Sequence, residues 1–113
     1  MDSIKKKDKK TIIIKERSWW HVRKYFKSGH AALIVGENED EFAFLNITKN
    51  PPNGYSYFET KNPISLLEKK KSHIRLYLQI GKKKRFSKWL MKYEFSKEDL
   101  EKVESFLNKT KSA

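Results

Sequence analysis

Two apolar runs separated by a single polar turn constrain the fold of this chain more than any other feature. The runs are AALIV at 31–35 and EFAFLNI at 41–47, and the turn between them is GENED at 36–40. Runs of this length bounded by turn residues predict strands, and the short connection predicts that they pair as a hairpin. Because both runs are apolar at nearly every position, we expect each strand to be buried on most of both faces.

A further strand pattern lies in SHIRLYLQIG, at 72–81. Apolar and polar residues alternate there, which predicts a strand over 73–79 with one face in the core and one polar face. We expect the apolar stripe to pack against the hairpin and a C-terminal helix. Shorter strands are predicted at 12–14 and around 55–57. The stripe consists of Ile74, Leu76, Leu78 and Ile80.

Helix signals occur on both sides of these strands. In RSWWHVRKYFKSG, at 17–29, the residues Trp19, Val22 and Phe26 have helical spacing, so we expect a helix there. Near the C-terminus, FSKEDLEKVESFL at 95–107 has both a capping pair and an apolar stripe, which predict a second helix. The capping pair is Ser96 and Asp99, and the stripe is Leu100, Val103, Phe106 and Leu107.

Together these elements predict a mainly β protein with helices, of the α+β class. Short strands with long connections favour a small, strongly bent antiparallel sheet or barrel closed by the C-terminal helix. A chain of 113 residues has the size of one domain. We assign that domain to residues 11–113 and interpret residues 1–10, MDSIKKKDKK, as a flexible basic arm.

The charge of the chain is strongly positive and unevenly distributed. The formal net charge is +12, and residues 60–92 contain eleven Lys or Arg against one acid, Glu68. The acidic residues gather instead at 37–41 and 94–104. A positive field attracts phosphate polyanions, and this segregation favours a nucleic-acid-binding face over uniform solvation.

Several classes of function lack support in the sequence. There is no cysteine, which excludes disulfides and thiolate nucleophiles and fits a reducing, cytoplasmic location. The three histidines, His21, His30 and His73, lack the spacing of a metal site, and no Gly-rich phosphate loop is present. No apolar run approaches the ~20 residues of a membrane span. We therefore expect no metal, no cofactor and no membrane partner.

The predicted hairpin carries polar side chains at its two open ends, His30 and Thr48. Side chains from neighbouring strands can meet there, so the two residues form a candidate catalytic pair. A histidine before a strand is also commonly a surface residue, and a threonine at a strand end is commonly a β-former or a cap. Both interpretations stay open at this point.

Basic residues and tyrosines near the strands are candidates for nucleic-acid contacts. Tyr55, Tyr57 and Tyr77 have rings on which bases could stack, although aromatics on small sheets more often pack in the core. The KKKR run at 82–85 could contact phosphates, or it could be a solvated loop. The predicted nucleic-acid-binding residues are Lys27, Lys49, Arg75, Tyr77, Lys82, Lys83, Lys84 and Arg85.

The order of these motifs resembles the MazF/PemK family of toxin endoribonucleases. GHAALIV followed by FAFLNITKN is similar to the family's Arg-Pro-x-x-Val-Ile strand and the next strand, which ends in Ile-Thr. YFETKNP resembles the strand that follows, and SHIRLYLQIGKKKRF resembles the family's Ser-x-Val-x-x-x-Gln strand and loop. FSKEDLEKVESFL resembles its terminal helix. The resemblance covers positions 29–107.

This resemblance implies an SH3-like β-barrel, a homodimer, an antitoxin protein as a partner, and metal-independent cleavage of single-stranded RNA rather than DNA. In the family, an arginine on the first strand and a threonine on the second are catalytic. Thr48 occupies the threonine position, whereas His30 stands at the arginine position. A histidine can transfer protons near neutral pH, which an arginine cannot.

The resulting hypothesis assigns His30 as the acid or base and Thr48 as a hydrogen-bond donor to the scissile phosphate. Lys27 or Lys49 would supply the positive charge that the family's arginine provides. One alternative is a non-catalytic nucleic-acid-binding protein on the same fold, for example an accessory protein of a mobile element. Another is a protein-interaction module in which the helix and the acidic turn bind a partner.

Overall fold

The structure is a computed structural model that describes residues 11–63 and 71–112, so the basic arm predicted at 1–10 lies outside the described residues. The strands are β1 (Ile13–Ile14), β2 (His21–Lys24), β3 (Ala31–Glu37), β4 (Glu41–Thr48), β5 (Tyr57–Pro63), β6 (Lys71–Arg75) and β7 (Gln79–Lys82). Two 3-10 helices, η1 (Arg17–Trp19) and η2 (Lys83–Arg85), and one α-helix, α2 (Lys97–Ser112), complete the described elements.

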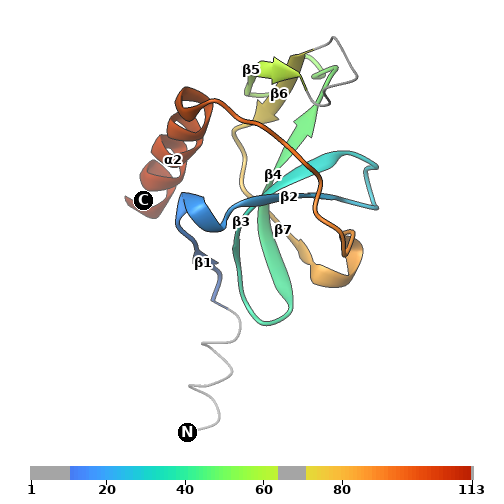
Figure 1. The fold of residues 1–113 in the computed structure, drawn as a ribbon. Coiled ribbons are helices and arrows are strands. Elements are labelled where there is room, and N and C mark those ends of the chain that lie inside the picture. Colours follow the sequence, from blue (N-terminus) through green and yellow to red (C-terminus); the bar gives the residue numbers. More distant parts are fainter. Residues whose placement is uncertain (1–10, 64–70, 113) are drawn as a thin grey trace, which may run out of the picture.

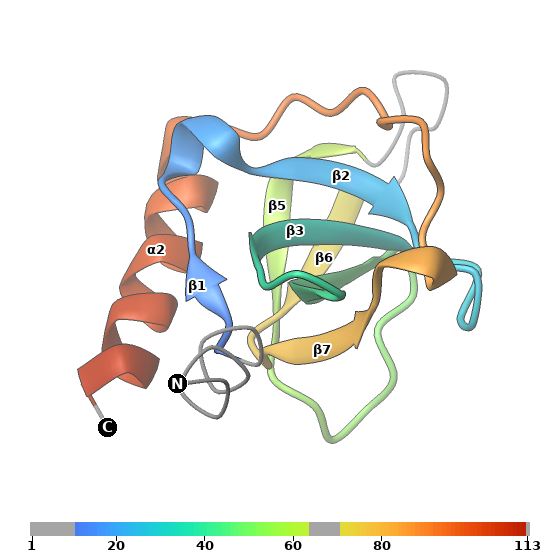
Figure 2. The same ribbon diagram turned by 90° about the horizontal axis from the view of Figure 1, so that it is seen from below.

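The described strands form one antiparallel sheet organised around β3 and β4. Strands β1 and β2 pair with opposite ends of β3, strands β6 and β7 pair with opposite ends of β4, and β5 pairs with β6. The sheet curls until its two ends approach each other. The segment after η2 is bridged to β2 at Val22–Met91 and directly after β2 at Tyr25–Phe86. Figures 1 and 2 show this curl, with α2 against one side of it. The predicted α+β class, with a strongly bent antiparallel sheet and a C-terminal helix, is confirmed.

The predicted hairpin of β3 and β4 is confirmed, and it is buried as expected. Its register runs from Ala31 opposite Ile47 to Glu37 opposite Phe42, with one irregularity between Ile34 and Gly36. All residues from 31 to 36 are buried. A side chain at Gly36 would place its Cβ 2.6 Å from the backbone oxygen of Ile13. Only glycine therefore lets β1 lie this close to β3.

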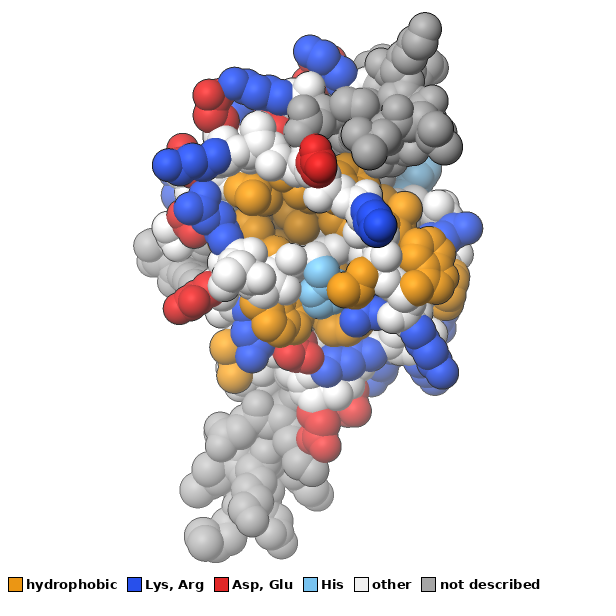
Figure 3. Space-filling model, in the orientation of Figure 1, with side chains coloured by type: hydrophobic (Ala, Val, Ile, Leu, Met, Phe, Trp, Pro, Cys, Tyr) orange, Lys and Arg blue, Asp and Glu red, His pale blue; other side chains and the backbone are white. Residues whose placement is uncertain are grey.

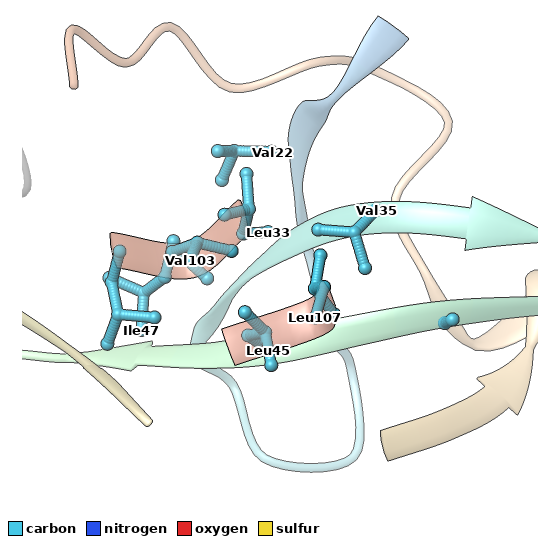
Figure 4. Close-up of a cluster of buried hydrophobic side chains, with 10 residues drawn as sticks. Val22, Leu33, Val35, Leu45, Ile47, Val103 and Leu107 are labelled. Atoms are coloured by element: carbon cyan, nitrogen blue, oxygen red, sulfur yellow. The ribbon is translucent and has the colours of Figure 1, made fainter. Parts of the chain in front are cut away.

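The central strands pack on both of their faces. On the helix face, Val103 and Leu107 of α2 contact a cluster that includes Leu33, Leu45 and Ile47 (Figure 4). On the opposite face, which we call the aromatic face, Phe42, Phe44 and Phe86 pack together with Tyr25 at the margin. The ring centroids of Phe44 and Phe86 are 5.0 Å apart, and those of Tyr25 and Phe86 are 4.7 Å apart.

The helix predicted at 17–29 is wrong. Only Arg17–Trp19 form a 3-10 turn, and the chain then continues as β2, in which Val22 pairs with Leu33. The helical spacing of the apolar residues was coincidental, because the edge of β3 offers backbone partners that outweigh a weak local preference. Phe26, which the expected helix would have placed on one face with Trp19 and Val22, is consequently 57% exposed.

The single strand predicted over 73–79 is also wrong in part, because the chain leaves the sheet at 76–78. His73 pairs with Thr48 and Gln79 pairs with Phe44, so six steps along this segment correspond to four steps along β4. The two extra residues preserve the alternation of faces. Ile74 is buried and Leu78 packs on the helix face, but Ile80 is 54% exposed rather than in the core.

The C-terminal helix is confirmed as α2, and one half of its capping box is formed. The Asp99 N–H donates to Ser96 Oγ at 3.1 Å, as expected of an N-cap serine. The Asp99 carboxylate instead accepts a hydrogen bond from the Lys61 N–H at 2.9 Å, which ties the helix to β5. In the described part of the chain, no helix is long and apolar enough to cross a membrane.

The helix-face core predicts a large difference between two Leu→Ala substitutions. Leu33 is 1% exposed, so Leu33→Ala removes buried contacts and is expected to lower the free energy of unfolding by about 2–5 kcal/mol. Leu90 is 56% exposed, so Leu90→Ala is expected to change it by less than about 0.5 kcal/mol. Urea unfolding of both variants measures the difference, and equal losses would contradict this packing.

Candidate functional site

A line of polar residues runs along one end of the sheet, past the start of β3 and across β4, β6 and β5. Ala31 pairs with Ile47, so the next residues outward are His30, just before β3, and Thr48, the last residue of β4. Thr48 pairs with His73 on β6, and His73 pairs with Glu59 on β5. Neighbouring strands lie about 4.8 Å apart, so Thr48, His73 and Glu59 are each close to the next, and His30 stands one residue beyond the pair Ala31–Ile47. We call His30, Thr48, His73 and Glu59 the polar row.

Local hydrogen bonds hold the backbone around His30 and the side chain of Thr48, the two members of the row that belong to the β3–β4 hairpin. Gly29 has φ +74°, and the chain turns there so that the Tyr25 N–H donates to the His30 carbonyl at 2.9 Å. The His30 N–H donates to Ser28 Oγ at 3.2 Å, and its side chain is exposed. The Thr48 side chain is buried, and its Oγ1 accepts a hydrogen bond from the Asn50 N–H at 3.3 Å. The Thr48 hydroxyl hydrogen is therefore left to donate.

Sequence reasoning did not select His73 and Glu59 as site residues. His73 Nε2 lies 3.6 Å from Glu59 Oε2, and His73 Nδ1 is buried without a hydrogen-bond partner in the described structure. The one available signal was the alternation over 73–79, which assigned His73 to a polar face. The alternation did not predict which residue of the β3–β4 hairpin would pair with His73.

The interior beside the polar row is itself polar. Asn46 lies two residues before Thr48 on β4, and Gln79 pairs with Phe44, so both share the aromatic face with Thr48 and His73. Asn46 Oδ1 and Gln79 Nε2 are buried and have no hydrogen-bond partner among the described residues. These groups lie where β6 and β7 separate, next to the candidate catalytic residues.

The predicted nucleic-acid-binding residues fall into two groups, and the first lies near the polar row. Lys27 is exposed on the connection between β2 and β3, and Lys49 directly follows Thr48. Arg75 is two residues beyond His73 on β6, and Tyr77 follows it where the chain leaves the sheet. The Arg75 guanidinium carbon lies 4.4 Å from the ring centroid of Tyr55 and 4.6 Å from that of Tyr77.

The second group, Lys82–Arg85, lies mainly at the other end of β4. Lys82 pairs with Glu41, which is seven residues, or roughly 24 Å, along the strand from Thr48. Lys83 Nζ lies 2.7 Å from Glu37 Oε1, so an acid already compensates this charge. Arg85 lies nearer the polar row, because its carbonyl accepts a hydrogen bond from the N–H of Phe26, on the connection between β2 and β3. The four basic residues at 82–85 and the polar row therefore do not form one continuous surface for binding phosphates.

A cleft of about 940 Å³ lies between β2 and residues 90–95. Figure 3 shows a hollow with apolar side chains at its floor near the middle of this face. The residues lining the cleft include Val22, Leu33, Met91 and Phe95, and no member of the polar row lines it. The cleft is thus separate from the candidate catalytic residues.

The third histidine, His21, has a structural role. Arg23 Nε–H donates to His21 Nε2 at 2.9 Å, which requires Nε2 to be unprotonated, so Nδ1–H donates to the Trp19 carbonyl at 3.2 Å. Burial in the edge of the aromatic face lowers the pKa of His21 below 6.5, and the nearby Arg23 charge acts in the same direction. His21 is held neutral between these two partners.

Among residues 11–63 and 71–112, no three His, Asp or Glu side chains come together in an arrangement that could hold a metal ion. Comparison of the chain with protein-family models, with curated protein sequences and with solved structures finds no match. The polar row and the residues around it are therefore the features of this chain that indicate a function.

The lowered pKa of His21 predicts a specific pH dependence of stability. Between the folded pKa and 6.5 the unfolded chain binds more protons, so stability rises with pH in that window. The contribution of His21 is complete above pH 6.5 and is lost as the pH falls below it. Urea unfolding of wild type and His21→Gln from pH 8 to pH 5 is expected to show a steeper loss for wild type. Parallel curves would contradict the assignment.

Proposed function

We propose that this protein is a metal-independent endoribonuclease of the toxin–antitoxin type that cleaves single-stranded RNA. The observation that carries the proposal is the strand register, which pairs Thr48 with His73 and leaves His30 and Thr48 as the next residues beyond the pair Ala31–Ile47. Two imidazoles beside a hydroxyl donor provide the groups that RNA cleavage by proton transfer needs. The net charge of +12 supports a polyanionic substrate.

In the proposed mechanism, His30 accepts the proton of the ribose 2′-hydroxyl, and the 2′-oxygen attacks the adjacent phosphorus. The bond from phosphorus to the 5′-oxygen breaks, and His73 donates a proton to that oxygen. The products are a 2′,3′-cyclic phosphate and a 5′-hydroxyl, so no water or metal ion is consumed. We assign the acid role to His73, whose Nε2 lies 3.6 Å from the Glu59 carboxylate, and the base role to His30, whose side chain is exposed at the end of the row.

Thr48 and the nearby lysines stabilise the charge that develops on the phosphate. The Thr48 hydroxyl donates a hydrogen bond to a non-bridging oxygen, and Lys27 and Lys49 contribute positive charge around it. Thr48 is 7% exposed and bonded to the Asn50 N–H, so its hydroxyl is held in place before the substrate binds. Such preorganisation is what makes a hydrogen bond effective in a transition state.

The curl of the sheet supports an SH3-like barrel as the scaffold for this activity. Strand β7 continues through η2 into a segment that bridges to β2, so the chain nearly closes a ring around the aromatic face. The proposal includes a homodimer and an antitoxin partner, as in the family that the sequence resembles. A non-catalytic RNA-binding protein on the same scaffold is the alternative, and it is favoured by His30 at the position where that family has arginine.

Incubation of the purified protein with a mixed-sequence single-stranded RNA in EDTA tests the proposal. Wild type is expected to release fragments with 2′,3′-cyclic phosphate ends. His30→Ala, His73→Ala and Thr48→Val are each expected to slow cleavage by about 100-fold or more, because each removes one proton-transfer or hydrogen-bonding group. The substitution Thr48→Val retains the shape of the buried side chain.

Lys109→Ala, an exposed change on α2, serves as the control and is expected to cleave like wild type. The rate is expected to pass through a maximum with pH, since one imidazole must be neutral and the other protonated. Intact RNA, with salt-dependent binding, would reject the nuclease and favour the alternative. Cleavage that survives in all three site variants would reject the assigned residues.

A further inference from the structure

Two exposed tyrosines and an arginine form a cluster on the same face as the polar row. The Arg75 guanidinium carbon is 4.4 Å from the Tyr55 ring centroid and 4.6 Å from the Tyr77 ring centroid. Tyr55 is 54% exposed and Tyr77 is 55% exposed, so each ring keeps a large accessible surface. We call Tyr55, Arg75 and Tyr77 the stacking platform.

The backbone holds the platform in a fixed place. Arg75 pairs with Tyr57 across β5 and β6, and the Leu76 N–H donates to the Ser56 carbonyl at 2.8 Å. Backbone hydrogen bonds therefore hold the segment that carries Tyr55 against the segment that carries Tyr77, at the position of Arg75. Tyr77 points outward because the chain leaves the sheet at 76–78, which is the same irregularity that separates β6 from β7.

The platform is adjacent to the proposed cleavage site. Phe58 and Ile74 pack on the helix face, so Glu59, His73 and Arg75 lie on the opposite face. His73 and Arg75 are two residues apart on one strand, a separation of about 7 Å. A nucleotide whose phosphate contacts Thr48 and His73 would bring a neighbouring base within reach of the platform.

The charges around the platform favour a nucleic acid. No ion pair within residues 11–63 and 71–112 involves Arg75, whereas Lys83 and Lys61 both have acidic partners. Among the described residues no acid compensates the Arg75 charge, which can therefore contact a phosphate, and the tyrosine rings are exposed to bases. Aromatic rings beside an unneutralised cation form the combination that binds single-stranded nucleic acid.

We propose that Tyr55, Arg75 and Tyr77 form a nucleobase-stacking subsite for single-stranded RNA, in which a base stacks on a tyrosine ring and Arg75 contacts the adjoining phosphate. This inference rests on the proposed function, because it assigns the bound polymer as the RNA that the polar row cleaves. The new element is the set of residues that hold a base beside the scissile phosphate.

The test measures binding without cleavage. The probe is a fluorescently labelled, fully 2′-O-methylated oligonucleotide of mixed sequence, which has no 2′-hydroxyl to act as a nucleophile. Its dissociation constant from the full-length protein is measured by fluorescence anisotropy in EDTA over a range of salt concentrations. Tyr55→Leu and Tyr77→Leu remove the ring but keep apolar bulk, and Tyr77→Phe keeps the ring. Trp89→Leu, at another exposed aromatic residue, is the matched control (56% exposed).

Tyr55→Leu and Tyr77→Leu are each expected to weaken binding by about 5-fold to 150-fold, whereas Tyr77→Phe and Trp89→Leu bind like wild type. An abasic version of the probe is expected to bind wild type and the two leucine variants equally, because it has no base to stack. Arg75→Ala is expected to reduce the slope of log K against log salt by about one, and the leucine variants leave that slope unchanged.

The subsite is overturned if both leucine variants bind within about twofold of wild type, if Trp89→Leu is as weak as they are, or if wild type fails to bind at low salt. The result is separable from that of the cleavage assay. Weak binding by the leucine variants with no RNA cleavage by wild type would retain the subsite and reject the nuclease. Normal binding by those variants together with RNA cleavage by wild type would reject the subsite and retain the nuclease.

Discussion

The pairing of β3 with β4 is the interaction on which the rest of the structure depends. The strands β1, β2, β6 and β7 all pair with one of these two strands, and β5 is added through β6. Side chains alternate between faces with a period of two, so a slip of one residue would exchange the helix face for the aromatic face. The same slip would also separate His30 from Thr48. One register therefore determines both the core and the candidate site.

The polar row lies at the end of the central strands, where burial changes over a short distance. Ile47 is 1% exposed and Thr48 is 7% exposed, whereas His30 lies outside the end of β3 and is exposed. A substrate can reach such a strand end, while the hydrophobic core behind it keeps Thr48 in place. Asn46, His73 and Gln79 each have a buried polar atom with no hydrogen-bond partner among the described residues, and these atoms lie on the same face. Buried polar atoms normally have such a partner.

The distribution of charge assigns different roles to the basic residues. Lys83 is held by Glu37 close to the turn between β3 and β4, so this part of the KKKR run helps to fix η2 against the hairpin. Arg75, by contrast, contacts two tyrosine rings and no acid in the described structure. The chain's net charge alone could not distinguish a lysine bound within the protein from a cation available to a ligand.

The sequence by itself determined the hairpin and the C-terminal helix, and it placed His30 and Thr48 at the open end of that hairpin, because each depends on patterns within a short stretch of chain. Tertiary structure decided the rest. Residues 17–29 follow a helical pattern, but the open edge of β3 makes Val22 a strand residue. His73 joins Thr48, and Arg75 lies between Tyr55 and Tyr77, only because β6 pairs with β4 and β5 and then leaves the sheet at 76–78. Such pairings join residues distant in sequence, and local propensity carries no information about which strands will meet.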